Sequence, residues 1–152
     1  MYTFQLFADY FQFYLQDEFA DGNLSEAWTN EAVARLVAIA PGTVGIGTVR
    51  NMKVPVTLEF LPSKPLLNED LWDHVVECSL VAGSANLVIS GCTDYFPDAD
   101  RIPLEPGTYR VRACFADLDS PSEDGLDGND RYHLQLWKED FSELTVIKQR
   151  AV

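Results

Sequence analysis

Basic residues are scarce in this sequence. Among its 152 residues, 11 Lys and Arg stand against 24 Asp and Glu, which gives a formal net charge of −13, and residues 1–34 contain no Lys or Arg. Nucleic-acid binding requires a basic surface that neutralises phosphates, and anionic lipid headgroups likewise attract basic segments. The composition therefore argues against nucleic acid and against a membrane surface as direct partners.

Long apolar runs are also missing. The longest uncharged stretch, residues 78–93, is interrupted by Ser, Gly and Asn, and it is shorter than the ~18 apolar residues of a transmembrane helix. A secretory signal carries basic residues ahead of its apolar segment, whereas the start of this chain has no base and is interrupted by Asp9. We therefore expect a soluble, cytoplasmic protein.

Histidine and cysteine are too few for the common catalytic and zinc sites. The two histidines are His74 and His133, and the three cysteines are Cys78, Cys92 and Cys114. Their spacings fit no metal motif, and neither a G-x-S-x-G sequence nor the usual phosphate-binding glycine loop is present. The neighbouring residues predict a hydrogen-bonded position in the core or at its rim for His74, a solvated sheet face for His133 and buried free thiols for the cysteines. The sequence thus predicts a protein that is not an enzyme and has no cofactor.

Most of the chain shows the alternation of apolar and polar residues that is typical of strands. The clearest examples are residues 54–60, 72–80, 109–115 and 132–136. Residues 2–15 also alternate, and their phase switches near Asp9, which indicates a bulge or a change of sheet. The length is that of one domain. We therefore predict that residues 1–152 form a single, mainly β domain, an antiparallel two-sheet β-sandwich.

Two local patterns refine this sandwich. Thr29 or Asn30 can cap one short α-helix near residues 30–40, whose apolar residues recur at helical spacing until Pro41-Gly42 ends it. Pro55 cannot donate a ladder hydrogen bond, so its strand is predicted to lie at a sheet edge or to start there.

Carboxylates are concentrated between the last two long predicted strands. Residues 117–130 contain six acids and no base: Asp117, Asp119, Glu123, Asp124, Asp127 and Asp130. Such a loop is consistent with a solvated hairpin connection, with a protein-binding loop, or with a calcium site, because calcium takes six to eight oxygen ligands from flexible loops. It does not follow the EF-hand register. A second, smaller group consists of Asp94, Asp98 and Asp100.

Five short segments carry a family resemblance: residues 10–13 (YFQF), 28–32 (WTNEA), 45–46 (GI), 50–51 (RN) and 104–109 (LEPGTY). In this order they resemble the competence protein J family, small bacterial proteins that inhibit a DNA-entry nuclease. The resemblance implies a shared fold and a nuclease as partner. The sequence departs from the family pattern in its longer acidic loop at 117–130 and in its tail beyond Trp137.

Charge and resemblance lead to one functional prediction. A strongly negative protein associates rapidly with basic partners, so we predict a non-enzymatic, acidic inhibitor or immunity-type protein that binds a basic protein partner such as a nuclease. The six carboxylates of residues 117–130 are the predicted contacts, and Asp94, Asp98 and Asp100 are secondary candidates. The alternative is a β-sandwich module that binds calcium or another small ligand. The sequence leaves the oligomeric state open.

Overall fold

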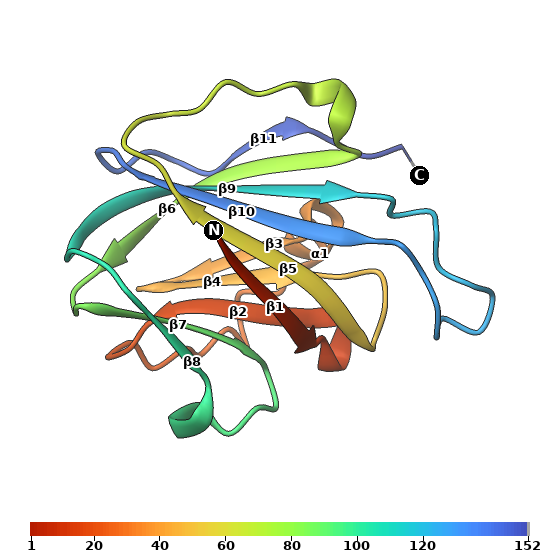
Figure 1. The fold of residues 1–152 in the computed structure, drawn as a ribbon, viewed down its shortest axis with the longest axis horizontal. Coiled ribbons are helices and arrows are strands. Elements are labelled where there is room, and N and C mark those ends of the chain that lie inside the picture. Colours follow the sequence, from red (N-terminus) through yellow and green to blue (C-terminus); the bar gives the residue numbers. More distant parts are fainter. Residues whose placement is uncertain (152) are drawn as a thin grey trace.

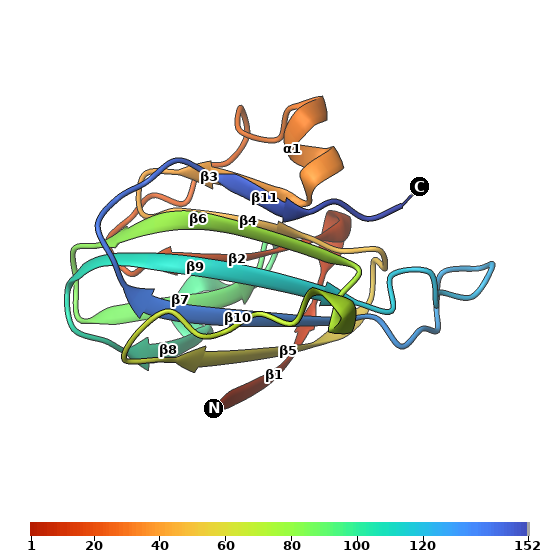
Figure 2. The ribbon, with the colours of Figure 1, turned by 90° about the horizontal axis from the view of Figure 1, so that it is seen from above.

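The computed structural model describes residues 1–151 and shows two β-sheets that pack face to face, with one short helix beside them (Figures 1 and 2). The six-stranded sheet has the order β1-β5-β10-β9-β6-β11, and the five-stranded sheet has the order β3-β4-β2-β7-β8. The first sheet consists of β1 (Tyr2–Phe7), β5 (Lys53–Phe60), β10 (Arg131–Lys138), β9 (Gly107–Ala116), β6 (His74–Ala82) and β11 (Thr145–Lys148). The second consists of β3 (Val37–Ala40), β4 (Thr43–Gly47), β2 (Gln12–Asp17), β7 (Asn86–Gly91) and β8 (Asp100–Pro103). The predicted mainly β sandwich is confirmed.

The core lies between the two sheets and is built from every second residue along the strands, those whose side chains face the other sheet. Phe13 of β2, Phe115 of β9 and Tyr132 of β10 are buried and meet edge to face, with ring centroids 5.7 to 6.0 Å apart. Such aromatic pairs stabilise a core by more than the area that they bury accounts for.

No helix within residues 1–151 is long and apolar enough to cross a bilayer.

The order of strands in the six-stranded sheet departs from a simple meander. The β9–β10 hairpin lies between β5 and β6, which are consecutive in this sheet along the chain. As a result β10 pairs with β5 in parallel, whereas the other strand pairs of residues 1–151 are antiparallel. Pro55 lies opposite Gln5 of β1, just before Val56, where pairing with β10 begins. The strand of Pro55 is therefore an interior strand, and the proline sits near its start, where no hydrogen bond to β10 is required.

The predicted helix is present but shorter than the sequence pattern indicates. Helix α1 (Asn30–Arg35) begins after Thr29, whose hydroxyl oxygen accepts a hydrogen bond from the Ala32 amide at 3.2 Å. It ends at Leu36, which has a left-handed backbone with φ of 63°. The extension to residue 40 was wrong: residues 37–40 form β3 and pair with β4, because their apolar side chains suit a strand beside an apolar neighbour as well as a helix face.

The phase switch near Asp9 marks a change of sheet, which is one of the two predicted alternatives, and not a bulge within one strand. β1 belongs to the first sheet and β2 to the second. Between them lies the short helical turn η1 (Asp9–Phe11), in which Tyr10 and Phe11 have φ values of 57° and 60°. These left-handed residues reverse the chain from one sheet to the other.

Candidate functional site

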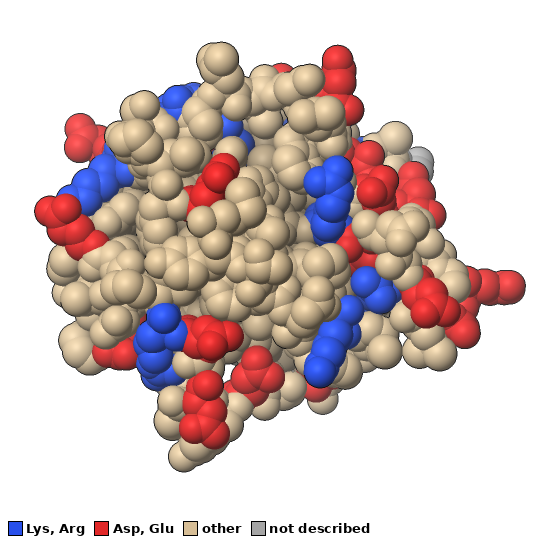
Figure 3. Space-filling model, in the orientation of Figure 1, with Lys and Arg blue, Asp and Glu red and all other residues tan. Residues whose placement is uncertain are grey.

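The acidic loop, residues 117–130, joins β9 to β10 and projects from one end of the sandwich (right in Figures 1 and 2). Carboxylates gather at the same end in the space-filling view (Figure 3). Five of the six acids of the loop are exposed, namely Asp117, Asp119, Glu123, Asp124 and Asp127. The basic side chain nearest to this group belongs to Arg131, whose Nε lies 3.8 Å from Asp117 Oδ2 with both side chains more than half exposed. The structure thus brings the predicted carboxylates together on a protruding segment.

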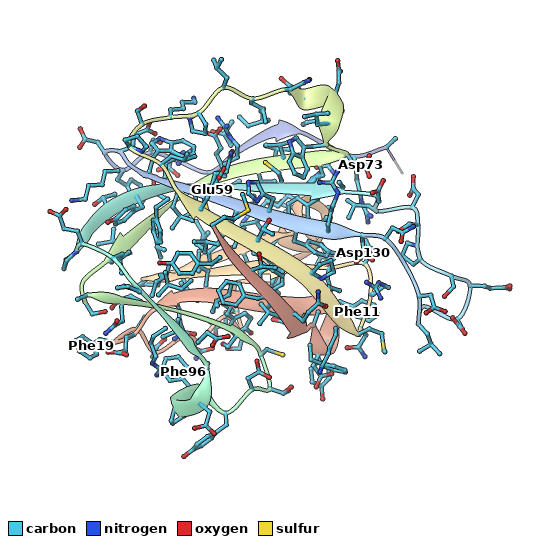
Figure 4. All side chains as sticks on the ribbon, viewed as in Figure 1. Phe11, Phe19, Glu59, Asp73, Phe96 and Asp130 are labelled. Atoms are coloured by element: carbon cyan, nitrogen blue, oxygen red, sulfur yellow. The ribbon has the colours of Figure 1, made fainter. Side chains whose placement is uncertain are left out.

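Asp130, the sixth acid, is a correction to the predicted contacts because its side chain is fully buried. Its Oδ1 lies 2.5 Å from Arg50 Nε, and its Oδ2 accepts a hydrogen bond of 2.6 Å from the Tyr132 hydroxyl. Arg50 also donates to the Leu126 carbonyl at 3.3 Å. In Figure 4 Asp130 lies at the root of the loop, where β10 begins. Asp130 therefore anchors the loop and is not available to a partner.

Two neighbours complete this anchor. The hydroxyl oxygen of Tyr132 accepts a hydrogen bond from the Val49 amide at 3.0 Å, and burial together with the bond to Asp130 raises the pKa of Tyr132 far above its ordinary value. Gly128 passes so close that a Cβ there would lie 2.8 Å from Asp130 Oδ1 and 2.9 Å from Arg50 Nε. Only glycine leaves room for the ion pair, which explains its position in the loop.

Hydrogen bonds within the loop fix its conformation. Asp124 Oδ1 accepts bonds from the Ser122 hydroxyl at 2.6 Å and the Leu126 amide at 3.1 Å, and the bond from Ser122 is the main reason that the pKa of Asp124 is lowered. The hydroxyl oxygen of Ser120 accepts from the Asn129 amide at 2.7 Å, which ties the two sides of the loop together. The exposed carboxylates are therefore displayed on an ordered segment.

The carboxylates of the loop do not converge on a common point. Within residues 1–151, no group of three or more His, Cys, Asp or Glu side chains is placed to hold a metal ion. Calcium needs several oxygens at 2.3–2.6 Å around one centre. The arrangement of this loop therefore does not favour the calcium alternative.

The secondary candidates lie elsewhere on the molecule. Asp94, Asp98 and Asp100 are exposed, and they follow β7 around the short helix η3 (Phe96–Asp98). Figure 4 places Phe96 of this segment at the lower left and Asp130 at the right. Asp94 also accepts a hydrogen bond of 2.7 Å from the Gly91 amide and so closes its own turn. The two acidic groups do not form one continuous patch.

Buried charges balance one another, so the negative charge belongs to the surface. Three acids and three arginines are buried: Asp17, Glu77, Asp130, Arg50, Arg110 and Arg112. Glu77 lies 3.0 Å from Arg112 and 3.6 Å from Arg110, on the outer side of the six-stranded sheet. The full net charge of −13 therefore remains on side chains that water or a partner can reach.

The histidines and cysteines take structural positions. His74 is buried as predicted, and its two ring nitrogens contact the Arg35 carbonyl at 2.6 Å and the Arg150 amide at 3.1 Å. The solvated position predicted for His133 was wrong, because Trp72 stacks on its ring with centroids 5.8 Å apart. Its Nε2 lies 3.2 Å from Oε1 of Glu59, a residue labelled in Figure 4.

All three cysteines are free. Cys78 and Cys114 are buried as predicted, and burial raises the pKa of each thiol to about 12. Cys92 is only half-buried, contrary to the prediction, because it follows the end of β7 where the chain leaves the sheet.

Sequence reasoning missed Arg50, the residue that secures the acidic loop. Arg50 lies 80 residues from Asp130 in the chain, and nothing in the spacing of the sequence connects the two. The pairing depends on the parallel contact of β5 with β10, which brings the start of β10 near the segment before β5. This contact could have been predicted only if the order of the strands in the sheet had been known.

The structure thus defines a class: a two-sheet β-sandwich that displays an ordered acidic loop. Solved structures with this fold include ComJ from Bacillus subtilis, described as an inhibitor of the DNA degrading activity of NucA, at 17% identity and a TM-score of 0.70. They also include the protein of crocagin biosynthetic gene J, at 18% identity and a TM-score of 0.59. Each comparison covers 91% of this chain and 96% of the other. The resemblance to competence protein J is confirmed at the level of the fold.

By sequence alone, the chain matches no protein family and no curated protein.

Proposed function

We propose that this protein is a non-enzymatic inhibitor of the immunity type, which acts in the cytoplasm by binding a basic protein partner. The partner that we propose is a nuclease. The observation that carries the proposal is the ordered acidic loop on a fold shared with ComJ, an inhibitor of the DNA degrading activity of NucA. Nucleases hold phosphodiesters in basic clefts. A protruding loop of carboxylates offers such a cleft a substitute for phosphate charge.

The order of the loop adds to its suitability as a binding element. Because hydrogen bonds within the loop and the Arg50–Asp130 pair already fix its conformation, little conformational entropy is lost when a partner binds. The surplus of surface acids accelerates encounter with a positive surface. Both effects favour a rapid and specific complex.

Three carboxylates lead among the proposed contacts: Asp119, Glu123 and Asp127. They are exposed, and within residues 1–151 their carboxylates accept no hydrogen bond. Asp124 is engaged with Ser122, and Asp117 lies near Arg131. Asp98 and Asp100 remain secondary contacts, since their position away from the loop suits only a large partner.

The test has two stages. NucA from Bacillus subtilis serves as the first probe, and the rate of DNA degradation is measured with and without the protein. If NucA is not inhibited, the protein is immobilised and proteins from an extract of its source cells are eluted with increasing salt. A basic protein that elutes with salt and is inhibited in solution supports the proposal. Failure in both stages refutes it.

A charge-matched pair of variants locates the contact surface. The triple variant Asp119→Asn, Glu123→Gln and Asp127→Asn removes three charges from the loop. The control variant Glu26→Gln, Asp70→Asn and Asp140→Asn removes three exposed charges outside the loop. The loop variant should slow association roughly tenfold at low salt and flatten its salt dependence. Equal slowing by both variants would show that overall charge, and not the loop, guides binding.

A further inference from the structure

The free edge of β1 differs from the three other sheet edges of residues 1–151. β3, β8 and β11 have four residues each, whereas β1 has six. β8 carries Asp100, Arg101 and Pro103, and β11 carries Lys148. At β3 the carbonyl of Val37 accepts a hydrogen bond from Arg35 Nε at 2.8 Å. Short length, charge and proline are the devices by which proteins prevent an edge strand from pairing with another chain.

β1 has none of these devices. Its sequence, Tyr-Thr-Phe-Gln-Leu-Phe, contains no charge, proline or glycine, although 23% of the chain is charged. It pairs with β5 alone, and its outward amides and carbonyls have no hydrogen-bond partner within residues 1–151. In Figure 3 the middle of the face over β1 and β5 is largely free of charged side chains, and the two charged residues of β5, Lys53 and Glu59, belong to the ends of that strand. Such an edge is a template for strand addition.

The two faces of β1 are chemically distinct. Leu6 is buried in the core, Phe4 packs against it, and Tyr2 stacks on Phe4 with ring centroids 6.5 Å apart. Thr3 and Gln5 point to the opposite, exposed face. An added strand must continue both faces, with apolar residues on one side and polar residues on the other.

We propose that the occupant of this edge is a second copy of the same chain, paired antiparallel through β1 about a two-fold axis at Phe4. In this register Tyr2 lies opposite Leu6 of the second copy, and Thr3 lies opposite Gln5, so apolar meets apolar and polar meets polar. The absence of charge selects the second copy over a basic partner. In a two-fold pair, a charged side chain on β1 lies near the same charged side chain of the second copy and repels it. A strand that binds a basic partner would instead be held more tightly if it carried a carboxylate.

The resulting dimer joins two six-stranded sheets into one continuous sheet. It is a weak dimer, because a single strand pair buries little area and each copy carries a net charge of −13. Salt screens the repulsion between the copies, so association strengthens as salt rises. This response is opposite to that expected for the proposed binding of a basic partner by the acidic loop, and the two interactions are therefore separable.

Sedimentation equilibrium of the full chain tests the proposal over a concentration series up to the millimolar range, at low and high NaCl. We expect a reversible monomer–dimer equilibrium that high salt favours. Thr3→Glu and Thr3→Lys should each weaken dimerisation roughly tenfold, because either sign places like charges on neighbouring strands. The double variant Thr3→Glu with Gln5→Lys sets opposite charges across the seam and should restore dimerisation.

Thr145 on β11 provides the control, since it is an exposed threonine on the other edge of the same sheet. Thr145→Glu and Thr145→Lys should leave the equilibrium unchanged. A chain that stays monomeric at millimolar concentration in high salt overturns the proposal. Opposite effects of Glu and Lys at Thr3 also overturn it and assign the edge to a charged partner. Slower hydrogen exchange of the β1 amides at high protein concentration would confirm where the copies meet.

Discussion

Arg50 and Asp130, which are 80 residues apart in sequence, form a buried ion pair with 2.5 Å between Nε and Oδ1. The pair joins the segment before β5 to the start of β10. It also holds the carbonyl of Leu126 in the acidic loop. One contact thus serves both the parallel strand pairing and the presentation of the carboxylates.

Loss of one partner from this pair should be strongly destabilising. Asp130→Asn or Arg50→Met leaves a charged group buried without its counterpart, which typically costs about 3 kcal/mol or more. We expect a decrease of this size in the free energy of unfolding, measured by urea denaturation. The double variant should be less destabilised than the sum of the single variants. Additive effects would show that the two charges do not interact.

Gly128→Ala should destabilise the loop anchor through steric contact. The new Cβ would lie under 3.0 Å from both Asp130 Oδ1 and Arg50 Nε, and such overpacking typically costs about 1–3 kcal/mol. Gly83→Ala is the matched control, because its Cβ would meet no atom closer than 3.9 Å. Unfolding curves that coincide for the two variants would contradict the steric account.

Protonation of His74 should reduce stability at acid pH. Burial lowers the pKa of His74 below its ordinary value, so the unfolded state binds the proton more readily than the folded state. The free energy of unfolding should therefore fall as pH decreases below about 6.5, by at most about 1.4 kcal/mol per pH unit from this group. His74→Gln should remove this part of the pH dependence in urea titrations, and His133→Gln serves as the comparison. An unchanged slope in His74→Gln would disprove the assignment.

Calcium should neither bind to nor stabilise the protein. No convergent set of carboxylates exists in residues 1–151, and ligands that bind only the folded state raise the melting temperature. We expect no heat in calorimetry and no change of melting temperature at millimolar calcium. A calcium-dependent increase that Asp124→Asn abolishes would return the acidic loop to the class of metal sites.

Local sequence patterns predicted the features that depend on neighbouring residues. The cap at Thr29 and the change of sheet near Asp9 were each one of two alternatives that the sequence offered, because capping and alternation are local properties. The end of α1 was predicted wrongly, since the apolar residues after Leu36 fit a helix face and an edge strand equally well. The burial of Asp130 was not predicted for a different reason, since it depends on the ion pair with Arg50. The two residues are 80 positions apart, and a contact over that separation produces no periodic pattern in the sequence.

The late arrival of the β9–β10 hairpin has a consequence for synthesis. β5 and β6 leave the ribosome before residues 107–138, which fill the space between them in the finished sheet. Until then each of the two strands lacks a neighbour, and non-local pairing of this kind is slow. We expect the nascent sheet to remain unfolded, and dependent on chaperones that shield unpaired strands, until residues 107–138 have been translated.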